Sequence, residues 1–125
     1  MRLRMELFVD DLDTSVTFWT GVLGFWIDRR DDGYASLRRG SVVLGLGPVA
    51  KLPSTGDGPG FTQSRLAAGK GAGVEIVLEV DDVDAVYESC AAAGVVAEGL
   101  TDRPWGLRDF RFTDPDGYYV RVTTR

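Results

Sequence analysis

Charged and aromatic residues at regular spacing are the groups in this sequence most able to do chemistry. Arg4 and Glu6 alternate with apolar neighbours near the start of the chain, and Asp109 and Arg111 do so near its end. Arginine can grip a carboxylate through two parallel hydrogen bonds, and positioned carboxylates can act as general acids and bases. Trp105 lies in a Pro-Trp-Gly turn and could offer a rigid, flat surface. Ion pairing, carboxylate chemistry and aromatic stacking are therefore the available tools.

Other chemistry is largely closed because the sequence has no histidine and only one cysteine, Cys90. Zinc, iron and nickel enzymes mostly recruit imidazole, and serine or cysteine nucleophiles usually need a histidine base. Carboxylate-only metal sites and carboxylate acid–base pairs remain open. A single cysteine also excludes an internal disulfide and fits a reducing compartment.

The bulk composition is that of one ordinary globular domain. The chain has 125 residues, 44% of them hydrophobic and 26% charged, with a net charge of −5. A nucleic-acid-binding role would need a basic face, whereas an acidic protein sooner attracts a cationic small molecule. No apolar run is long enough to span a membrane, and the first residues do not form a signal peptide. We therefore expect a cytoplasmic protein with no nucleic-acid or membrane partner.

Apolar periodicity predicts the elements of the first half. Met5, Leu7 and Val9 alternate as in a half-buried strand. A helix follows, with Asp13 as its predicted N-cap and Gly24 as a left-handed cap at its other end. Three short strands are then predicted over 25–30, 34–38 and 42–46. Residues 48–71, rich in proline and glycine, are predicted to form a long linker or flap.

The second half repeats this order. A strand over 76–80 precedes a helix that begins near Val83 and is closed by Gly94, and a bent strand follows over 95–100. A hairpin ends the chain, turning at Asp114-Pro115-Asp116-Gly117. Phe8–Asp13 resembles Glu79–Asp84 at an offset of 71 residues, which indicates an internal repeat.

The repeat predicts an α+β fold of two βαβββ modules within a single domain, 1–125. The first module is 1–47, the linker or flap 48–71 and the second module 72–125. Each module is expected to form a curved mixed sheet with its helix on the convex face, and the opposite faces are expected to close around a cavity. Trp19, Phe110, Phe112 and Cys90 are predicted core residues.

Alternation then assigns the side chains of the cavity face. They are Arg4, Glu6, Phe8, Tyr34, Ser36, Arg38, Val43, Gly45, Glu75, Val77, Glu79, Asp109, Arg111, Tyr119 and Arg121. The alternative is that some of these charges simply face solvent at strand edges.

The chain resembles the vicinal oxygen chelate superfamily, which includes glyoxalase I, extradiol dioxygenases and bleomycin resistance proteins. The resemblance rests on Asp11–Trp19, Leu23–Phe25, Val80–Val83 and Asp114–Gly117. Phe18-Trp19-Thr20 and Pro104-Trp105-Gly106 are most similar to the bleomycin resistance branch. The resemblance implies a homodimer in which each site is shared between chains.

The resemblance also places the usual metal ligands at Arg4, Gly45, Glu75 and Arg121. Two cations and a glycine cannot bind a divalent ion, which needs neutral or anionic donors. We therefore expect no metal and no cofactor. Arg4, Glu75 and Arg121 are expected to pair with one another instead, either to hold the sheets together or to grip a polar part of a ligand.

These features predict a metal-independent binding protein that sequesters a planar aromatic small molecule in a dimer groove, as antibiotic resistance proteins do. Trp105 and Tyr34 would stack on the ligand, unless they are ordinary loop and core residues. Glu6, Glu79 and Asp109 would meet ligand cations. Arg4, Glu75, Arg111 and Arg121 would complete the polar lining, and no residue would be catalytic.

Two alternatives remain open. The first is a divalent-metal-dependent lyase, isomerase or dioxygenase of the same superfamily, with Glu6, Glu75 and Glu79 as its acids and bases. The second is a dimeric scaffold without a ligand.

Overall fold

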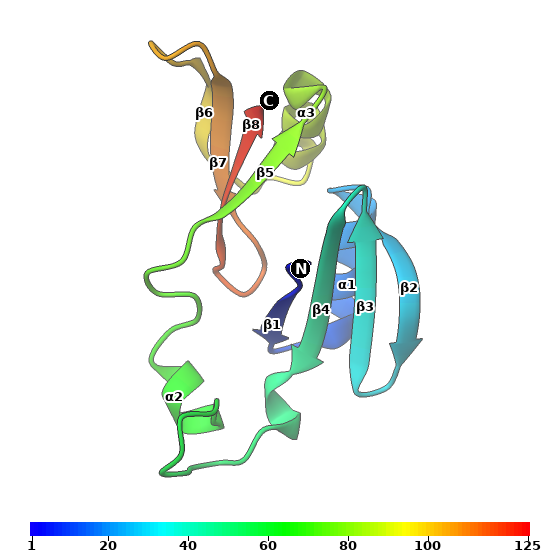
Figure 1. The fold of residues 1–125 in the computed structure, drawn as a ribbon, viewed down its shortest axis with the longest axis vertical. Helices are drawn as coiled ribbons and strands as arrows, with labels where there is room; N and C mark the ends of the chain where they lie inside the picture. Colours follow the sequence, from blue (N-terminus) through cyan, green and yellow to red (C-terminus); the bar gives the residue numbers. More distant parts are fainter. The chain divides into compact units, whose positions relative to one another are not determined.

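A computed structural model describes residues 1–125, which separate into two compact units, Met1–Lys70 and Gly71–Arg125. Each unit contains a four-stranded mixed sheet with a ten-residue helix packed on one face (Figure 1). That the two units form a single domain stays a prediction. None of the helices combines the length and apolar character needed to cross a bilayer.

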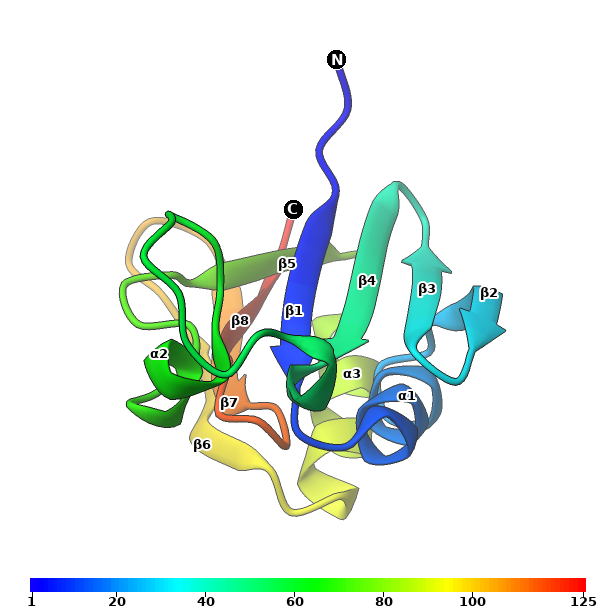
Figure 2. The same ribbon diagram turned by 90° about the horizontal axis from the view of Figure 1, so that it is seen from below.

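The first unit follows the predicted order of elements. These are β1 (Met5–Val9), α1 (Leu12–Gly21), β2 (Trp26–Asp31), β3 (Tyr34–Arg39) and β4 (Val42–Pro48). Figure 2 shows the strands side by side in the order β1-β4-β3-β2, with β1 parallel to β4 and the other neighbours antiparallel. The chain before β1 extends beyond the end of that strand.

One face of this sheet packs on α1. Its buried side chains are Leu7, Val9, Ala35, Leu37, Leu44 and Leu46, and α1 contributes Leu12, Val16, Phe18 and Trp19. The Trp19 ring is 1% exposed and meets Phe25 edge-on at 5.3 Å between ring centroids. The prediction that Trp19 belongs to the core is therefore confirmed.

The start of α1 differs from the prediction. Asp11 is the N-cap, and its side chain accepts a hydrogen bond of 2.8 Å from the Thr14 N–H. Accepting this bond lowers the pKa of the Asp11 carboxyl. The prediction of Asp13 was wrong because a cap oxygen must lie before the first turn to reach its free N–H groups, and Asp13 is already inside that turn, paired with Arg30.

The predicted linker contains two short helical segments, η1 (Val49–Lys51) and α2 (Gln63–Ala67). The Arg65 guanidinium donates to the backbone carbonyls of Gly56, Gly58 and Gly60. A single side chain therefore ties together the glycine-rich loop that precedes α2.

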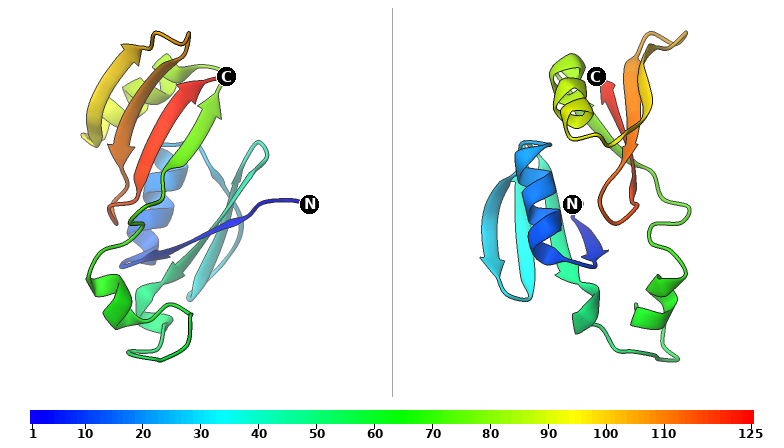
Figure 3. Two further views of the ribbon diagram at one scale, coloured as in Figure 1. Left: turned by 60° about the vertical axis from the view of Figure 1, so that its left-hand side comes forward. Right: turned by 180° about the vertical axis from the view of Figure 1, so that it is seen from behind.

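The second unit has the same topology as the first. Its elements are β5 (Ile76–Val80), α3 (Val83–Ala92), β6 (Val96–Asp102), β7 (Arg108–Thr113) and β8 (Tyr119–Thr124). The left view of Figure 3 shows the strands in the order β5-β8-β7-β6, with α3 behind them. Both β5 and α3 begin 71 residues after β1 and α1, at 76 against 5 and at 83 against 12. The predicted repeat is confirmed.

The core of this unit lies between its sheet and α3. Phe110, Phe112, Val120 and Val122 are 0% exposed, as is Cys90 on α3. Burial raises the pKa of the Cys90 thiol to about 11, so this cysteine is a small inert hydrophobe at neutral pH. All three core predictions for this unit are confirmed.

Candidate functional site

The sheet face opposite α1 carries the predicted site residues of the first unit. Glu6 lies opposite Gly45 in the register of β1 and β4, and Gly45 lies opposite Ser36 on β3. The Tyr34 hydroxyl lies 2.9 Å from Glu6 Oε1 and 3.0 Å from Oε2, so it donates to this carboxylate. Glu6 and Tyr34 are therefore brought together across the sheet.

Gly45 makes this contact possible. A Cβ atom at this position would lie 2.1 Å from Glu6 Oε2 and 2.3 Å from the Tyr34 hydroxyl. Both separations are far shorter than van der Waals contact, so any other residue would displace the pair. The resemblance assigns a metal ligand to position 45. Here the space beside Gly45 is filled by the carboxylate of Glu6 and the hydroxyl of Tyr34, from the two neighbouring strands.

Two arginines surround the same tyrosine. Arg4 Nε donates to Glu6 Oε1 at 2.5 Å, and its guanidinium carbon lies 5.6 Å from the centroid of the Tyr34 ring. The guanidinium carbon of Arg29 lies 5.4 Å from the same centroid. Cation–π contact of this kind stabilises both guanidinium groups in their positions beside the Tyr34 ring. A flat ligand stacking on Tyr34 would therefore have to replace or join a guanidinium.

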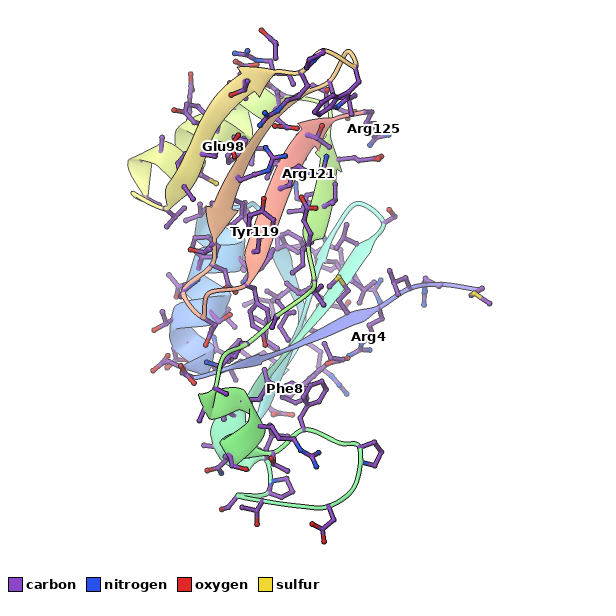
Figure 4. All side chains as sticks on the ribbon, turned by 90° about the vertical axis from the view of Figure 1, so that its left-hand side faces the viewer. Arg4, Phe8, Glu98, Tyr119, Arg121 and Arg125 are labelled. Carbon is purple, nitrogen blue, oxygen red and sulfur yellow. The ribbon has the colours of Figure 1, made fainter.

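An aromatic pair lies beside this cluster on β1. Phe8 points to the same side as Glu6, and Figure 4 shows its side chain on that strand. Its ring lies 4.7 Å from that of Phe61, which stands next to Thr62, the N-cap residue of α2. Phe61 is 56% exposed, so the pair leaves an apolar surface open to solvent.

In the second unit the predicted pair of Glu75 and Arg121 is present. Arg121 Nε donates to Glu75 Oε1 at 2.6 Å, and both side chains are partly exposed. Figure 4 shows Arg121 and Tyr119 on the face of the sheet turned away from α3. Glu79 is exposed on β5. The predicted joining of Arg4 to the Glu75 pair stays a prediction, and the partner of Arg4 within its own unit is Glu6.

Asp109 is the centre of an ionic network on the same face. Its side chain is 0% exposed, and its Oδ1 accepts hydrogen bonds from Arg103 Nε at 2.8 Å and from an Arg111 nitrogen at 3.1 Å. Both arginines also pair with Glu98, at 2.6 Å and 3.4 Å. The hydrogen bond from Arg103 is the main cause that lowers the pKa of Glu98. Asp109 therefore lies beneath two arginines, and a ligand cation would have to displace them to reach it.

Sequence reasoning missed three members of these clusters, Arg29, Arg103 and Glu98. The registers of β2 with β3 and of β6 with β7 shift near Arg29 and Glu98. Such a bulge breaks the alternation by which cavity-facing side chains are assigned. Arg103 precedes β7 and has no strand pattern. The sequence feature that could have pointed to Arg103 is its position next to Pro104, in the turn that carries Trp105.

Trp105 is the most exposed tryptophan of the chain, at 63%. It lies in a tight turn between β6 and β7, where Gly106 has a φ of +89° and its N–H donates to the carbonyl of Arg103 at 3.0 Å. A positive φ is easily adopted only by glycine, so the turn requires a glycine directly after Trp105. The structure presents the indole on this turn.

The four positions assigned to metal ligands do not fit a divalent cation. Arg4 and Arg121 are cationic and already paired with carboxylates, and Gly45 has no side-chain donor. Among residues 1–125, no group of three or more histidine, cysteine, aspartate or glutamate side chains is placed to bind a metal. The donor set that remains, Glu75 alone, is insufficient for a resident ion.

The fold and the sequence as a whole define a known class of protein. The chain belongs to the glyoxalase/bleomycin resistance protein/dioxygenase superfamily, whose sequence profile matches residues 3–122. It is 28% identical over 117 residues to the bleomycin resistance proteins of Geobacillus stearothermophilus and Staphylococcus aureus, which covers 90% of this chain and 87% of each relative.

Solved structures agree with this assignment. TioX from Micromonospora sp. ML1 superposes with a TM-score of 0.79 at 25% identity, covering 99% of this chain and 98% of that one. A bleomycin-binding protein in complex with bleomycin gives 0.67 at 23% identity, with 100% and 98% covered. Lactoylglutathione lyase from Agrobacterium tumefaciens gives 0.72 at 23%, with 98% and 92% covered. The last two likenesses show the shared fold alone.

Proposed function

We propose that this protein binds a planar aromatic small molecule and sequesters it without chemical change, in the manner of an antibiotic resistance protein. The protein acts as a homodimer in the cytoplasm and uses no metal ion. The observation that carries the proposal is the pairing of an exposed indole, Trp105, with family metal positions that hold no donor set. A protein with these features offers a flat ring a stacking surface, and its family metal positions offer no donor set for a Lewis acid.

Charge favours a cationic ligand. The chain carries a net charge of −5, and Glu75 and Glu79 are exposed on the second unit. Acidic surfaces raise the local concentration of cations and speed their encounter. The curated relatives named bleomycin resistance proteins make bleomycin the first probe to try.

In the proposed site, aromatic side chains stack on the ligand and charged side chains form the polar lining. Trp105 supplies the stacking surface, and Tyr34 supplies a second ring whose hydroxyl is held by Glu6. The polar lining is formed by Arg4, Glu75, Arg111 and Arg121, and each of these side chains is paired with an opposite charge. Because Asp109 is buried under Arg103 and Arg111, its role is to hold those arginines, with Glu75 and Glu79 nearer to a ligand cation.

The test is the affinity of metal-free bleomycin and a panel of flat aromatic antibiotics, measured by calorimetry with Trp105→Ala. Removing the indole loses stacking worth about 0.5–1.5 kcal/mol beyond its buried area, so we expect binding roughly tenfold weaker. Trp26→Ala is the matched control, since Trp26 is also exposed, at 54%. We expect it to bind as the wild type does.

Two results would contradict the proposal. One is equal affinity of the wild type and Trp105→Ala for every compound that binds. The other is binding of Ni²⁺, Mn²⁺ or Fe²⁺ at one ion per chain together with turnover of a substrate, which would favour the lyase, isomerase or dioxygenase alternative.

A further inference from the structure

The turn that carries Trp105 is closed at its base by the backbone of a single residue. The Arg103 N–H donates to the carbonyl of Leu107 at 2.7 Å, and the Arg103 carbonyl accepts from Gly106 at 3.0 Å. Arg103 therefore makes both backbone hydrogen bonds that define the turn. Backbone bonds of this kind shape a turn, but they do not fix its direction relative to the sheet.

The side chain of Arg103 supplies that second constraint. It reaches from the turn to Asp109 at 2.8 Å and to Glu98 at 2.6 Å, while its own side chain is 17% exposed. Asp109 is a firm anchor because β7 lies between β6 and β8 and its side chain is fully buried. One planar guanidinium thus ties the turn to two strands of the sheet.

The surroundings of Asp109 indicate that its ion pair with Arg103 does more than stabilise the fold. Its Oδ2 is buried without a hydrogen-bond partner, and so is the Oγ1 of Thr123, which lies opposite it on β8. A buried charge with an unsatisfied oxygen contributes little net stability. In some proteins such ion pairs specify one arrangement of the groups they join, and the Arg103–Asp109 pair joins the turn to a buried position of β7.

We infer that Arg103 is a positioning residue, which holds the Trp105 turn in one orientation through Asp109 and Glu98 so that the indole is ordered before a ligand arrives. Its consequence for affinity rests on the proposed function. The order of the indole does not, and can be measured without a ligand. Preorganisation of this kind lowers the cost of binding because fewer groups are immobilised on contact.

The experiment uses the full chain labelled with 5-fluorotryptophan, with the Trp105 ¹⁹F resonance assigned from Trp105→Phe. Arg103→Met removes the tie, and Arg103→Lys keeps the charge but loses the planar fork that serves two carboxylates. Arg108→Met is the control, since Arg108 also pairs with two carboxylates, Asp84 and Asp102, and begins the same strand. In Arg103→Met we expect the Trp105 resonance to move toward its position in the urea-unfolded chain while Trp19 keeps its native shift, and we expect an intermediate shift in Arg103→Lys.

With bleomycin as the probe, Arg103→Met should dissociate about two- to tenfold faster than the wild type, with Arg108→Met unchanged. An unaltered Trp105 resonance in Arg103→Met would overturn the inference, as would equal shifts in Arg103→Met and Arg108→Met. If Arg103→Met does not fold, an unaltered resonance in Arg103→Lys has the same force. A displaced resonance in a protein that binds no member of the panel would support the inference and count against the proposed function.

Discussion

At the scale of single residues, the first unit shows how one glycine can decide what its neighbours do. Gly45 leaves the face of β4 bare, and Glu6 and Tyr34 fill the space from the two flanking strands. Gly47, two residues further on the same face, has only the Phe8 ring nearby, at 3.8 Å from a would-be Cβ. The two glycines therefore form a natural pair for comparison.

Gly45→Ala should be less stable than Gly47→Ala by about 1 kcal/mol, as judged from urea midpoints. At both positions alanine reduces the backbone entropy of the unfolded chain, which favours the folded state. Only at position 45 does the added methyl group displace the carboxylate of Glu6 from the Tyr34 hydroxyl. The absence of a difference between the variants would mean that this contact contributes nothing to the folded state.

The individual predictions from the sequence succeeded where a side chain had one possible environment. Trp19, Phe110 and Phe112 are large and apolar at helical or strand spacing, so burial was their only stable outcome, and they are buried. Asp109 differs because the alternation of its strand predicted only which face of the sheet the side chain is on, and not whether it is buried. Its complete burial depends on Arg103 and Arg111, one of which lies outside any strand and so escaped the pattern.

At the scale of elements, strand periods and turns were predictable because they depend on local rules, whereas the N-cap of α1 was predicted two residues too late, at Asp13 instead of Asp11. The turn at Asp114–Gly117 formed as predicted, with Asp114 Oδ1 accepting from the N–H groups of Asp116 and Tyr118. What the sequence could not supply was the interruption of β2 and β6 by register shifts. A bulge adds a residue to one strand, and its location depends on how that strand fits its neighbour.

The cap of α3 allows a test at this scale. Asp82 accepts a hydrogen bond of 3.0 Å from the Ala85 N–H, so Asp82→Ala should lower the free energy of unfolding by about 1 kcal/mol. Its neighbour Asp81 makes only an exposed ion pair with Arg125. Asp81→Ala should therefore be close to neutral in the same urea titration. Equal losses in the two variants would show that the acidic charge matters and the cap does not.

At the scale of the whole molecule, the prediction of a single domain requires that the two units unfold together. The chain has a probe for each. Trp19 is buried in the first unit and Cys90 in the second. With a thiol pKa of about 11, native Cys90 holds about 0.1% thiolate at pH 8 and should be protected from thiol reagents.

In a Trp105→Phe background, where every tryptophan lies in the first unit, we expect tryptophan emission and Cys90 labelling to give the same urea midpoint. Coincident transitions seen by independent probes are the mark of one cooperative domain. Midpoints that differ by more than their measurement error would show two independently folding halves.

The equal registers of the two sheets have a consequence for how this molecule arose. Leu44 and Val120 occupy equivalent positions and are both buried, whereas the next residues along each strand are Gly45 and Arg121. If an ancestral segment was duplicated, its copies have kept the side that packs on a helix and diverged on the other. What was inherited is a scaffold, and each copy has since acquired chemistry of its own.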